Sequence, residues 1–387
     1  MRSAQLLPAA IAWLACSTSF AQQPYVALEE HDASQPRTAT RQFPLAVGEA
    51  ETRLYLDAHI ALTAGKARLR LLGPDGEVLR DDATENDLTF QATLPVSHPG
   101  TYHLELDQQA AAGTVQVHVY PLHPAAAART AIAAGLGIVL VVGASVLYFR
   151  RKSRAGWRWL WVGAAIWTVG VGLKFAWAVP LNAPILRMVK HAVPPAAYLP
   201  IAALYIGLLT GIFEIGVTLL AGFIWRKMAA DAPRAVGVGV GAGAFEALLL
   251  GLASLSVGAV VASGLAPDAL TAELTAPTLM NSAAWLCGPV ERIIAILCHT
   301  SSRALTLLTV ATRRWRYFWL GFALMTVLDG IAGYFLLSGA ARTVSAWWIE
   351  LAIAPFGIAG VPIILWCVRR WPAASAPQGE PAVTPGV

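Results

Sequence analysis

Residues 236–262 read VGVGVGAGAFEALLLGLASLSVGAVVA, a run whose only charged side chain is Glu246. An apolar run of this length can cross the hydrocarbon core of a bilayer, which is about 30 Å thick. A charge at bilayer depth costs about 3 kcal/mol or more, so such a side chain is rare and usually faces a bundle interior or a polar site. The stretch therefore predicts a transmembrane helix that presents one carboxylate to its neighbours.

Other long apolar runs carry ionisable residues in the same way. Glu214, Glu291, His299 and Asp329 each lie inside a run of this kind. Together with Glu246 they fall on four consecutive runs, which predicts one shared polar site. The predicted spans cover about residues 130–149, 157–178, 198–225, 236–262, 283–311, 316–337 and 347–368.

Composition agrees with a membrane protein. Hydrophobic residues make up 56% of the chain and charged residues 13%, far from the balance of a soluble domain. The formal net charge is +5, but the basic residues cluster at the ends of the apolar runs. This placement is typical of membrane topology, so we expect a lipid bilayer and no nucleic acid as partner.

The N-terminus has the pattern of a secretory signal. Arg2 supplies the positive region, residues 6–15 the apolar core, and residues 19–21 a small-residue cleavage site. We predict a signal peptide at residues 1–21. A lipoprotein anchored through Cys16 is the alternative.

Residues 22–124 read as an exported domain. Residues 68–71 and 102–106 alternate between apolar and polar side chains, and a Gly-Pro-Asp-Gly turn occupies residues 73–76. Such alternation, broken by turns, predicts an antiparallel β-sandwich with a buried face. The predicted fold class is therefore β + α, an extracytoplasmic sandwich followed by a polytopic bundle of about seven transmembrane helices.

The helical domain is predicted to comprise residues 125–371. One connection within it, residues 179–197, is rich in proline. Because proline removes a backbone donor and clashes with the preceding turn, we expect this connection to be an interfacial or re-entrant segment and not one regular helix. The prolines concerned are Pro180, Pro184, Pro194 and Pro195.

The basic residues predict the orientation. They gather on one set of connections, at residues 150–158, 226–234, 313–316 and 369–370, and are fewer on the opposite set. By the positive-inside rule, the N-terminal domain lies outside and the C-terminus lies in the cytoplasm, in a bacterial-type inner membrane. Residues 372–387 are rich in Pro and Ala, which predicts a disordered cytoplasmic tail.

Helical spacing predicts how the charges of residues 283–311 are directed. At 100° per residue, Arg292, His299 and Arg303 share one stripe, and Glu291 lies about 80° away. Arg292 could therefore neutralise a glutamate of a neighbouring helix, Glu246 or Glu214. Buried pairs of this kind can be catalytic, or they can simply fix the packing of the helices.

The glycine repeat before Glu246 predicts close helix packing. No strand precedes it, so a dinucleotide-binding loop is a poor interpretation. Gly239 and Gly243 fit the pattern of small residues four apart that lets two membrane helices approach closely. We expect this approach to bring polar groups of another helix near Glu246.

These residues carry a resemblance to a known family. Phe213-Glu214, the repeat ending Phe245-Glu246-Ala247, the run Glu291-Arg292-Ile293-Ile294-Ala295 with His299, and Asp329 resemble the YhfC-type intramembrane metalloproteases, relatives of the CAAX-protease and PrsW groups. The similarity covers about residues 198–337. It implies a metal, zinc, or a glutamate-activated water held between the helices, and cleavage of a membrane protein or peptide.

The resemblance also implies roles for individual residues. Glu246 would be both a catalytic residue and a metal ligand. The other catalytic residues implied are Glu214, Glu291 and Arg292. The other metal ligands implied are His299 and Asp329.

The sequence departs from the family pattern at three places. Ile215 follows Glu214 where a second glutamate and an arginine are usual, and Ala242 and Met325 stand where histidines are expected. Two functions therefore stay open: an intramembrane peptidase, or a catalytically silent scaffold or binding protein with an extracytoplasmic recognition domain. A transporter is less supported because the spans show no inverted repeat.

Overall fold

The computed structural model describes residues 26–48, 53–280, 283–340 and 344–372. It divides into two compact units, of which the first takes Met1–Thr130 and Gly258–Ser282 and the second takes Ala131–Val257 and Ala283–Val387. The predicted signal peptide lies outside the described residues, as does the predicted tail beyond its first residue.

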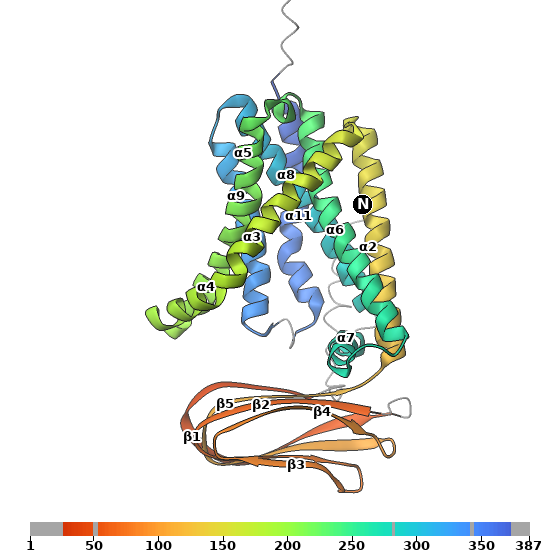
Figure 1. Ribbon diagram of the computed structural model, residues 1–387, viewed down its shortest axis with the longest axis vertical. Coiled ribbons are helices and arrows are strands. Elements are labelled where there is room, and N and C mark those ends of the chain that lie inside the picture. Colours follow the sequence, from red (N-terminus) through yellow and green to blue (C-terminus); the bar gives the residue numbers. More distant parts are fainter. Residues whose placement is uncertain (1–25, 49–52, 281–282, 341–343, 373–387) are drawn as a thin grey trace, which may run out of the picture. The chain divides into compact units, whose positions relative to one another are not determined.

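The first unit contains one antiparallel five-stranded sheet (Figure 1). Its order is β1-β5-β2-β3, and β4 pairs with the other part of the same edge of β2. This confirms the predicted antiparallel sheet in the N-terminal region. The strands are β1 (Val26–Val47), β2 (Arg53–Leu72), β3 (Val78–Thr84), β4 (Asp87–Pro95) and β5 (Gly100–Pro121).

The long strands are irregular near their middles. The register between β2 and β5 shifts around Ala64. Gly65 has a φ of +79°, and a Cβ there would lie 2.2 Å from the carbonyl oxygen of Ala110. Only glycine fits this approach. Leu56 and Leu69, on either side of the irregularity, belong to the same buried core.

A helix that the sequence did not predict, α7 (Asp268–Met280), also belongs to the first unit. Its first residue, Asp268, forms an ion pair with Arg53 at 3.0 Å and accepts a hydrogen bond of 2.8 Å from Thr93. Ala272 packs with Tyr55 and Leu122. α7 is short, and it buries the small residues Thr271, Ala272 and Thr275, so no strong apolar stripe marks it in the sequence.

Among the described residues, seven long apolar helices, each able to cross a membrane by length and composition, make up most of the second unit. They lie where the sequence predicts spans, and they indicate a multi-pass membrane protein. The helices are α2 (Pro124–Ser153), α3 (Trp157–Ala192), α4 (Pro195–Thr210) continued by the π-helical turn η1 (Gly211–Gly216) and α5 (Val217–Ile224), α6 (Ala232–Ala262), α8 (Cys287–Thr312), α9 (Arg316–Leu337) and α11 (Ala346–Arg370).

The expectation for the proline-rich connection was wrong over most of its length. α3 continues through Pro180 and Pro184 and ends at Ala192. Membrane helices tolerate proline because neighbouring helices, Ser and Thr side chains and small local adjustments satisfy the backbone groups that each proline leaves unpaired. The helix stops where Val193 adopts φ −123° and ψ 156°, the extended conformation favoured before a proline.

The glycine repeat lets α6 pack closely against two neighbouring helices, α3 and α8. Residues two apart on a helix point in nearly opposite directions, so successive glycines alternate between the neighbours. A Cβ at Gly241 would lie 2.0 Å from the carbonyl oxygen of Leu160 on α3, and one at Gly239 would lie 2.6 Å from the Cα of Thr300 on α8. This confirms the predicted close approach and brings α6 against α8, the most buried of the seven helices.

Candidate functional site

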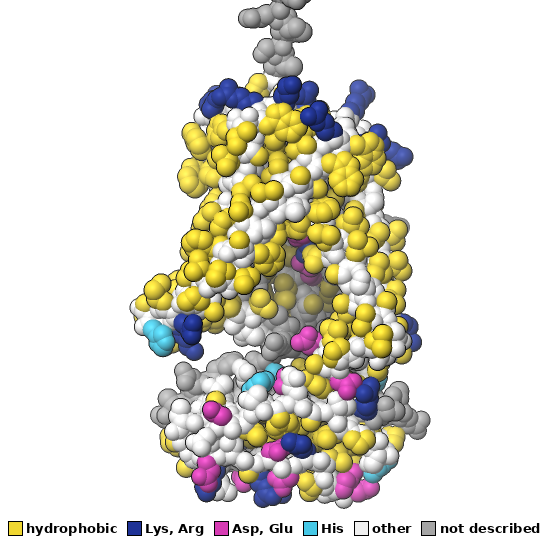
Figure 2. Space-filling model, in the orientation of Figure 1, with side chains coloured by type: hydrophobic (Ala, Val, Ile, Leu, Met, Phe, Trp, Pro, Cys, Tyr) yellow, Lys and Arg dark blue, Asp and Glu magenta, His cyan; other side chains and the backbone are white. Residues whose placement is uncertain are grey.

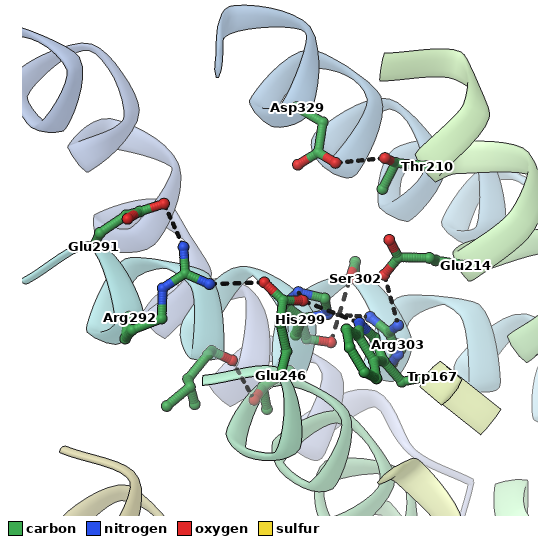
Figure 3. Close-up of polar contacts among 12 residues, drawn as sticks. Trp167, Thr210, Glu214, Glu246, Glu291, Arg292, His299, Ser302, Arg303 and Asp329 are labelled. Carbon is green, nitrogen blue, oxygen red and sulfur yellow. Dashed lines mark hydrogen bonds and ion pairs between the residues drawn. The ribbon is translucent and has the colours of Figure 1, made fainter. Parts of the chain in front are cut away.

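Glu246 of α6 is the best-connected carboxylate of the bundle (Figure 3). Its Oε1 lies 2.7 Å from Nη1 of Arg292, and its Oε2 lies 2.9 Å from Nε2 of His299. The indole nitrogen of Trp167 donates a hydrogen bond of 3.0 Å to the same Oε2. The pairing of Arg292 with Glu246 confirms the prediction from helical spacing. Arg292 also pairs with Glu291.

Glu214 is placed by a local irregularity of its helix. It lies on η1, one widened turn between α4 and α5, and such π-helical turns are frequent at functional sites. Its Oε1 lies 2.8 Å from Nζ of Lys174, and its Oε2 lies 3.3 Å from Nη2 of Arg303. The side chain is buried, so both oxygens depend on these cations.

Asp329 of α9 joins the network at its edge. Thr210 donates a hydrogen bond to its Oδ2, and Nζ of Lys174 lies 4.0 Å from the same oxygen. Lys174 therefore lies between Asp329 and Glu214. It also donates a hydrogen bond of 3.2 Å to Thr210.

The charges of this network do not balance. It contains the four carboxylates Glu214, Glu246, Glu291 and Asp329, and the three cations Lys174, Arg292 and Arg303. Uncompensated charge is costly where water is scarce. One further positive charge, such as a proton or a monovalent cation, would make the network neutral.

Three members of the network have the arrangement of a metal-ligand group. Glu214, Glu246 and His299 each offer one ligand atom, and these atoms lie within 4.8 Å of one another. Among the described residues, this is the one group of three or more His, Cys, Asp or Glu side chains that could hold a metal ion. Asp329, which the resemblance implied as a ligand, is not a member of it.

Charged groups of the bundle can be reached from outside. Figure 2 shows acidic and basic side chains at the bottom of a hollow between apolar surfaces of the helical unit. Glu246 and Asp329 have 22% and 34% of their side-chain surfaces exposed, whereas Glu214 has 3%. Glu291 is 41% exposed, so Glu246, Asp329 and Glu291 are the carboxylates of the network that a bound molecule could contact most directly.

The family model of the YhfC intramembrane metalloproteases matches residues 136–352. The chain belongs to this family. The match extends beyond the region in which the sequence motifs lie and includes most of α2 and all of α3, which supplies Trp167 and Lys174 to the site. A comparison with curated proteins finds no match.

Sequence reasoning missed three residues of this YhfC-family site: Trp167, Lys174 and Thr210. Lys174 is a charged residue within a predicted span, so the criterion that selected Glu246 also applies to it. Trp167 and Thr210 carry no such signal, because tryptophan and threonine are ordinary residues of membrane helices. The sequence predicts that Arg303 lies on the same stripe of its helix as His299. Its contact with Glu214 could not be predicted, because that contact depends on where η1 lies.

Proposed function

We propose that this chain is an intramembrane peptidase whose centre is formed by Glu214, Glu246 and His299. The observation that carries the proposal is the convergence of three ligand atoms, from three different spans, within 4.8 Å. Membership of the YhfC family supports it. So does the hollow through which a substrate could reach the charged groups (Figure 2).

The metal that we propose is Zn²⁺. One imidazole and two carboxylates are donors that zinc accepts, and catalytic zinc sites use three protein ligands and leave a position open. The net negative charge of the network favours the binding of a cation as well. When bound, zinc would supply a Lewis acid that polarises the carbonyl of a peptide bond.

Each charged residue then has a role that follows from its contacts. Arg292 holds Oε1 of Glu246 and leaves Oε2 directed to the ligand group, where Glu246 would serve as ligand or general base. Glu291 holds Arg292 from its other side, and Arg292 would stabilise developing negative charge. We assign Asp329 an orienting role through Thr210, since it stands outside the ligand group.

The surroundings of the site suggest its substrate and topology. We propose a membrane protein or peptide as substrate and a bacterial-type inner membrane as the location, with a signal peptide at residues 1–21. Lys and Arg gather at one end of the helical unit (Figure 2), which supports a cytoplasmic C-terminus by the positive-inside rule. Residues 22–124 would be an exported domain whose bent sheet encloses its core as a sandwich.

A silent scaffold is the second candidate, and a specific observation favours it. Each proposed ligand already has a partner within the chain, since Arg292 pairs with Glu246, while Lys174 and Arg303 pair with Glu214. A bundle can use such pairs for packing alone. In that case the exported domain would capture partners and the helices would only anchor it.

The deciding experiment is cleavage of a model transmembrane substrate by the full-length protein in liposomes. Glu246→Gln keeps the size of the side chain and removes the charge, so we expect loss of cleavage with the fold retained. Thr168→Val is a control in a neighbouring part of the bundle, because among the described residues the hydroxyl of Thr168 bonds the carbonyl of Ala164 on its own helix and no member of the network. Cleavage by Glu246→Gln at the wild-type rate would exclude Glu246 from the chemistry, and no cleavage by the wild type would favour the scaffold.

A further inference from the structure

Arg303 is a fully buried cation that bridges two of the three proposed ligands. It lies one helical turn after His299 on α8, and its side chain is 0% exposed. Its Nη1 lies 2.6 Å from Nδ1 of His299, and its Nη2 lies 3.3 Å from Oε2 of Glu214. The guanidinium thus stands between an imidazole and a carboxylate, as a metal ion would.

The contact with Arg303 determines which ring nitrogen of His299 carries the proton. A guanidinium keeps its charge in proteins and only donates hydrogen bonds, so Nδ1 of His299 must accept. The ring proton is then on Nε2, which donates to Oε2 of Glu246 at 2.9 Å. A metal that binds Nε2 has to take the place of this proton.

The hydrogen bond from Arg303 to His299 therefore disfavours metal binding at His299. Were Nε2 to bind a metal while Nδ1 still accepted from Arg303, the ring would carry no proton at all. A metal-bound histidine ordinarily donates its other N–H to an acceptor, which raises its basicity, and here a donor faces that nitrogen instead. Binding requires Arg303 to leave Nδ1.

The surroundings of Arg303 allow such a move. Its Nε is buried and has no hydrogen-bond partner among the described residues, so the side chain is not fully satisfied where it lies. Glu214 offers it a second attachment, and Lys174 already holds the other oxygen of that carboxylate. Because Lys174 stays paired with Glu214, Arg303 can withdraw from both ligands without leaving that carboxylate unpaired.

We propose that Arg303 is an internal counter-cation that holds the ligand group together without metal and competes with metal for it, so that its displacement sets the metal affinity. The inference rests on the proposed function, because it concerns the same ligand group. It adds a regulatory element: the group exists in a latent form closed by Arg303 and in a metal-loaded form from which Arg303 has withdrawn.

The test is zinc affinity of the full-length protein in detergent, measured by competition with a chelator of known affinity. Arg303→Met removes the charge and keeps the length, and we expect it to bind zinc at least about tenfold more tightly than the wild type. Adding Glu214→Gln to this variant should remove the gain, because the carboxylate that was set free is then lost. Arg369→Met, at the exposed end of α11, is the matched control and should bind zinc as the wild type does.

The outcomes separate this inference from the proposed function. Zinc binding by the wild type with unchanged or weaker binding by Arg303→Met would overturn the inference and leave the function standing. Tight binding by Arg303→Met alone would support the inference and show that the natural chain stays in the latent form. No binding by either protein would overturn both.

A second measurement, nitrogen NMR, tests the inference in protein that keeps Arg303. Nitrogen NMR of histidine-labelled protein distinguishes the two ring tautomers, and His299→Ala identifies the signal. We expect a bare Nδ1 in the metal-free protein and a protonated Nδ1 after zinc is added. A protonated Nδ1 before zinc is added would show that Arg303 does not hold this ring.

Discussion

Gly243 of α6 lies so close to His299 of α8 that a Cβ on the glycine would lie 2.9 Å from the Cβ of the histidine. The same Cβ would lie 2.9 Å from the Cα of Ile296, which is backbone and cannot turn aside. The distance from Glu246 to His299 therefore depends on the absence of a side chain at position 243. The glycine acts on the site through helix packing, without any polar group.

Gly243→Val should separate α6 from α8. We expect a loss of about 1–3 kcal/mol of stability, the usual cost of overpacking, together with loss of cleavage because Glu246 moves away from His299. Thermal unfolding in detergent and the cleavage assay measure the two effects. Gly172→Val on α3 is the control, since a Cβ there meets nothing within 4 Å. Equal effects of the two substitutions would mean that valine acts through helix propensity alone.

His299→Ala should lower the zinc content of the purified protein. Elemental analysis is the measurement, and we expect near-stoichiometric zinc in the wild type and little in the variant. His191→Ala, at the exposed end of α3, serves as the control and should keep its zinc. Equal zinc in all three proteins would place the metal elsewhere.

Zinc should also stabilise the folded protein. A ligand that binds only the native state adds about 2.7 kcal/mol at a free concentration 100 times its Kd. We therefore expect the melting temperature to rise with zinc in the wild type and to stay constant in His299→Ala. A rise of the same size in the variant would show that zinc acts at another place.

Thr210→Val tests the orienting role of Asp329. The substitution keeps the shape of the side chain and removes the hydroxyl that donates to Asp329 and accepts from Lys174. We expect kcat to fall about tenfold, the order of effect for a lost orienting hydrogen bond, with KM nearly unchanged and with unchanged zinc content. Loss of zinc would instead indicate that Asp329 is a ligand.

The sheet of the first unit should lose stability in acid. A hydrogen bond from Gln42 and the pairing with Arg70 lower the pKa of Glu105 below its ordinary value of 4.5, against the opposing effect of burial. A carboxyl whose folded pKa is depressed stabilises the fold above its unfolded pKa, and this contribution is lost as the pH falls from about 4.5 through the folded pKa.

Hydrogen exchange of the β5 amides in the full-length protein measures this effect, after correction for the intrinsic pH dependence of exchange. We expect protection to fall below about pH 4.5 in the wild type, and to fall less steeply in Glu105→Gln. Identical profiles of the two proteins would assign the acid sensitivity to other groups.

The sequence was sufficient for the number and position of the membrane helices, because length and apolar composition alone determine them. It also predicted that Arg292 pairs with a glutamate of a neighbouring helix, Glu246 or Glu214, since α8 is regular and 100° per residue holds along it; the structure selects Glu246. The spacing of small residues predicted a close helix approach at Gly239 and Gly243, but not that the partner is α8.

The parts that the sequence did not predict depend on irregular backbone and on neighbours far apart in the chain. Nothing in the run around Glu214 signals a π-helical turn, so the direction of that side chain could not be derived from a regular period. The course of α3 beyond Pro180 does not follow from the rule that proline breaks a helix, because membrane helices tolerate proline better than helices in water do. The contacts among Thr210, Lys174 and Asp329 could not be predicted, because they depend on the relative positions of the three helices α4, α3 and α9.

The π-helical turn η1 also makes the third span sensitive to chain length. Deleting one residue within Gly211–Gly216 would restore a regular α-helix, because a π-helical turn holds about one residue more than an α-helical turn, and it would leave α4 and α5 nearly in phase. Glu214 would lose the widened turn that places it between Lys174 and Arg303. A membrane helix commonly tolerates changes at its ends, but here an insertion or deletion of a single residue in mid-membrane would take apart the charge network while leaving the hydrophobic length almost the same.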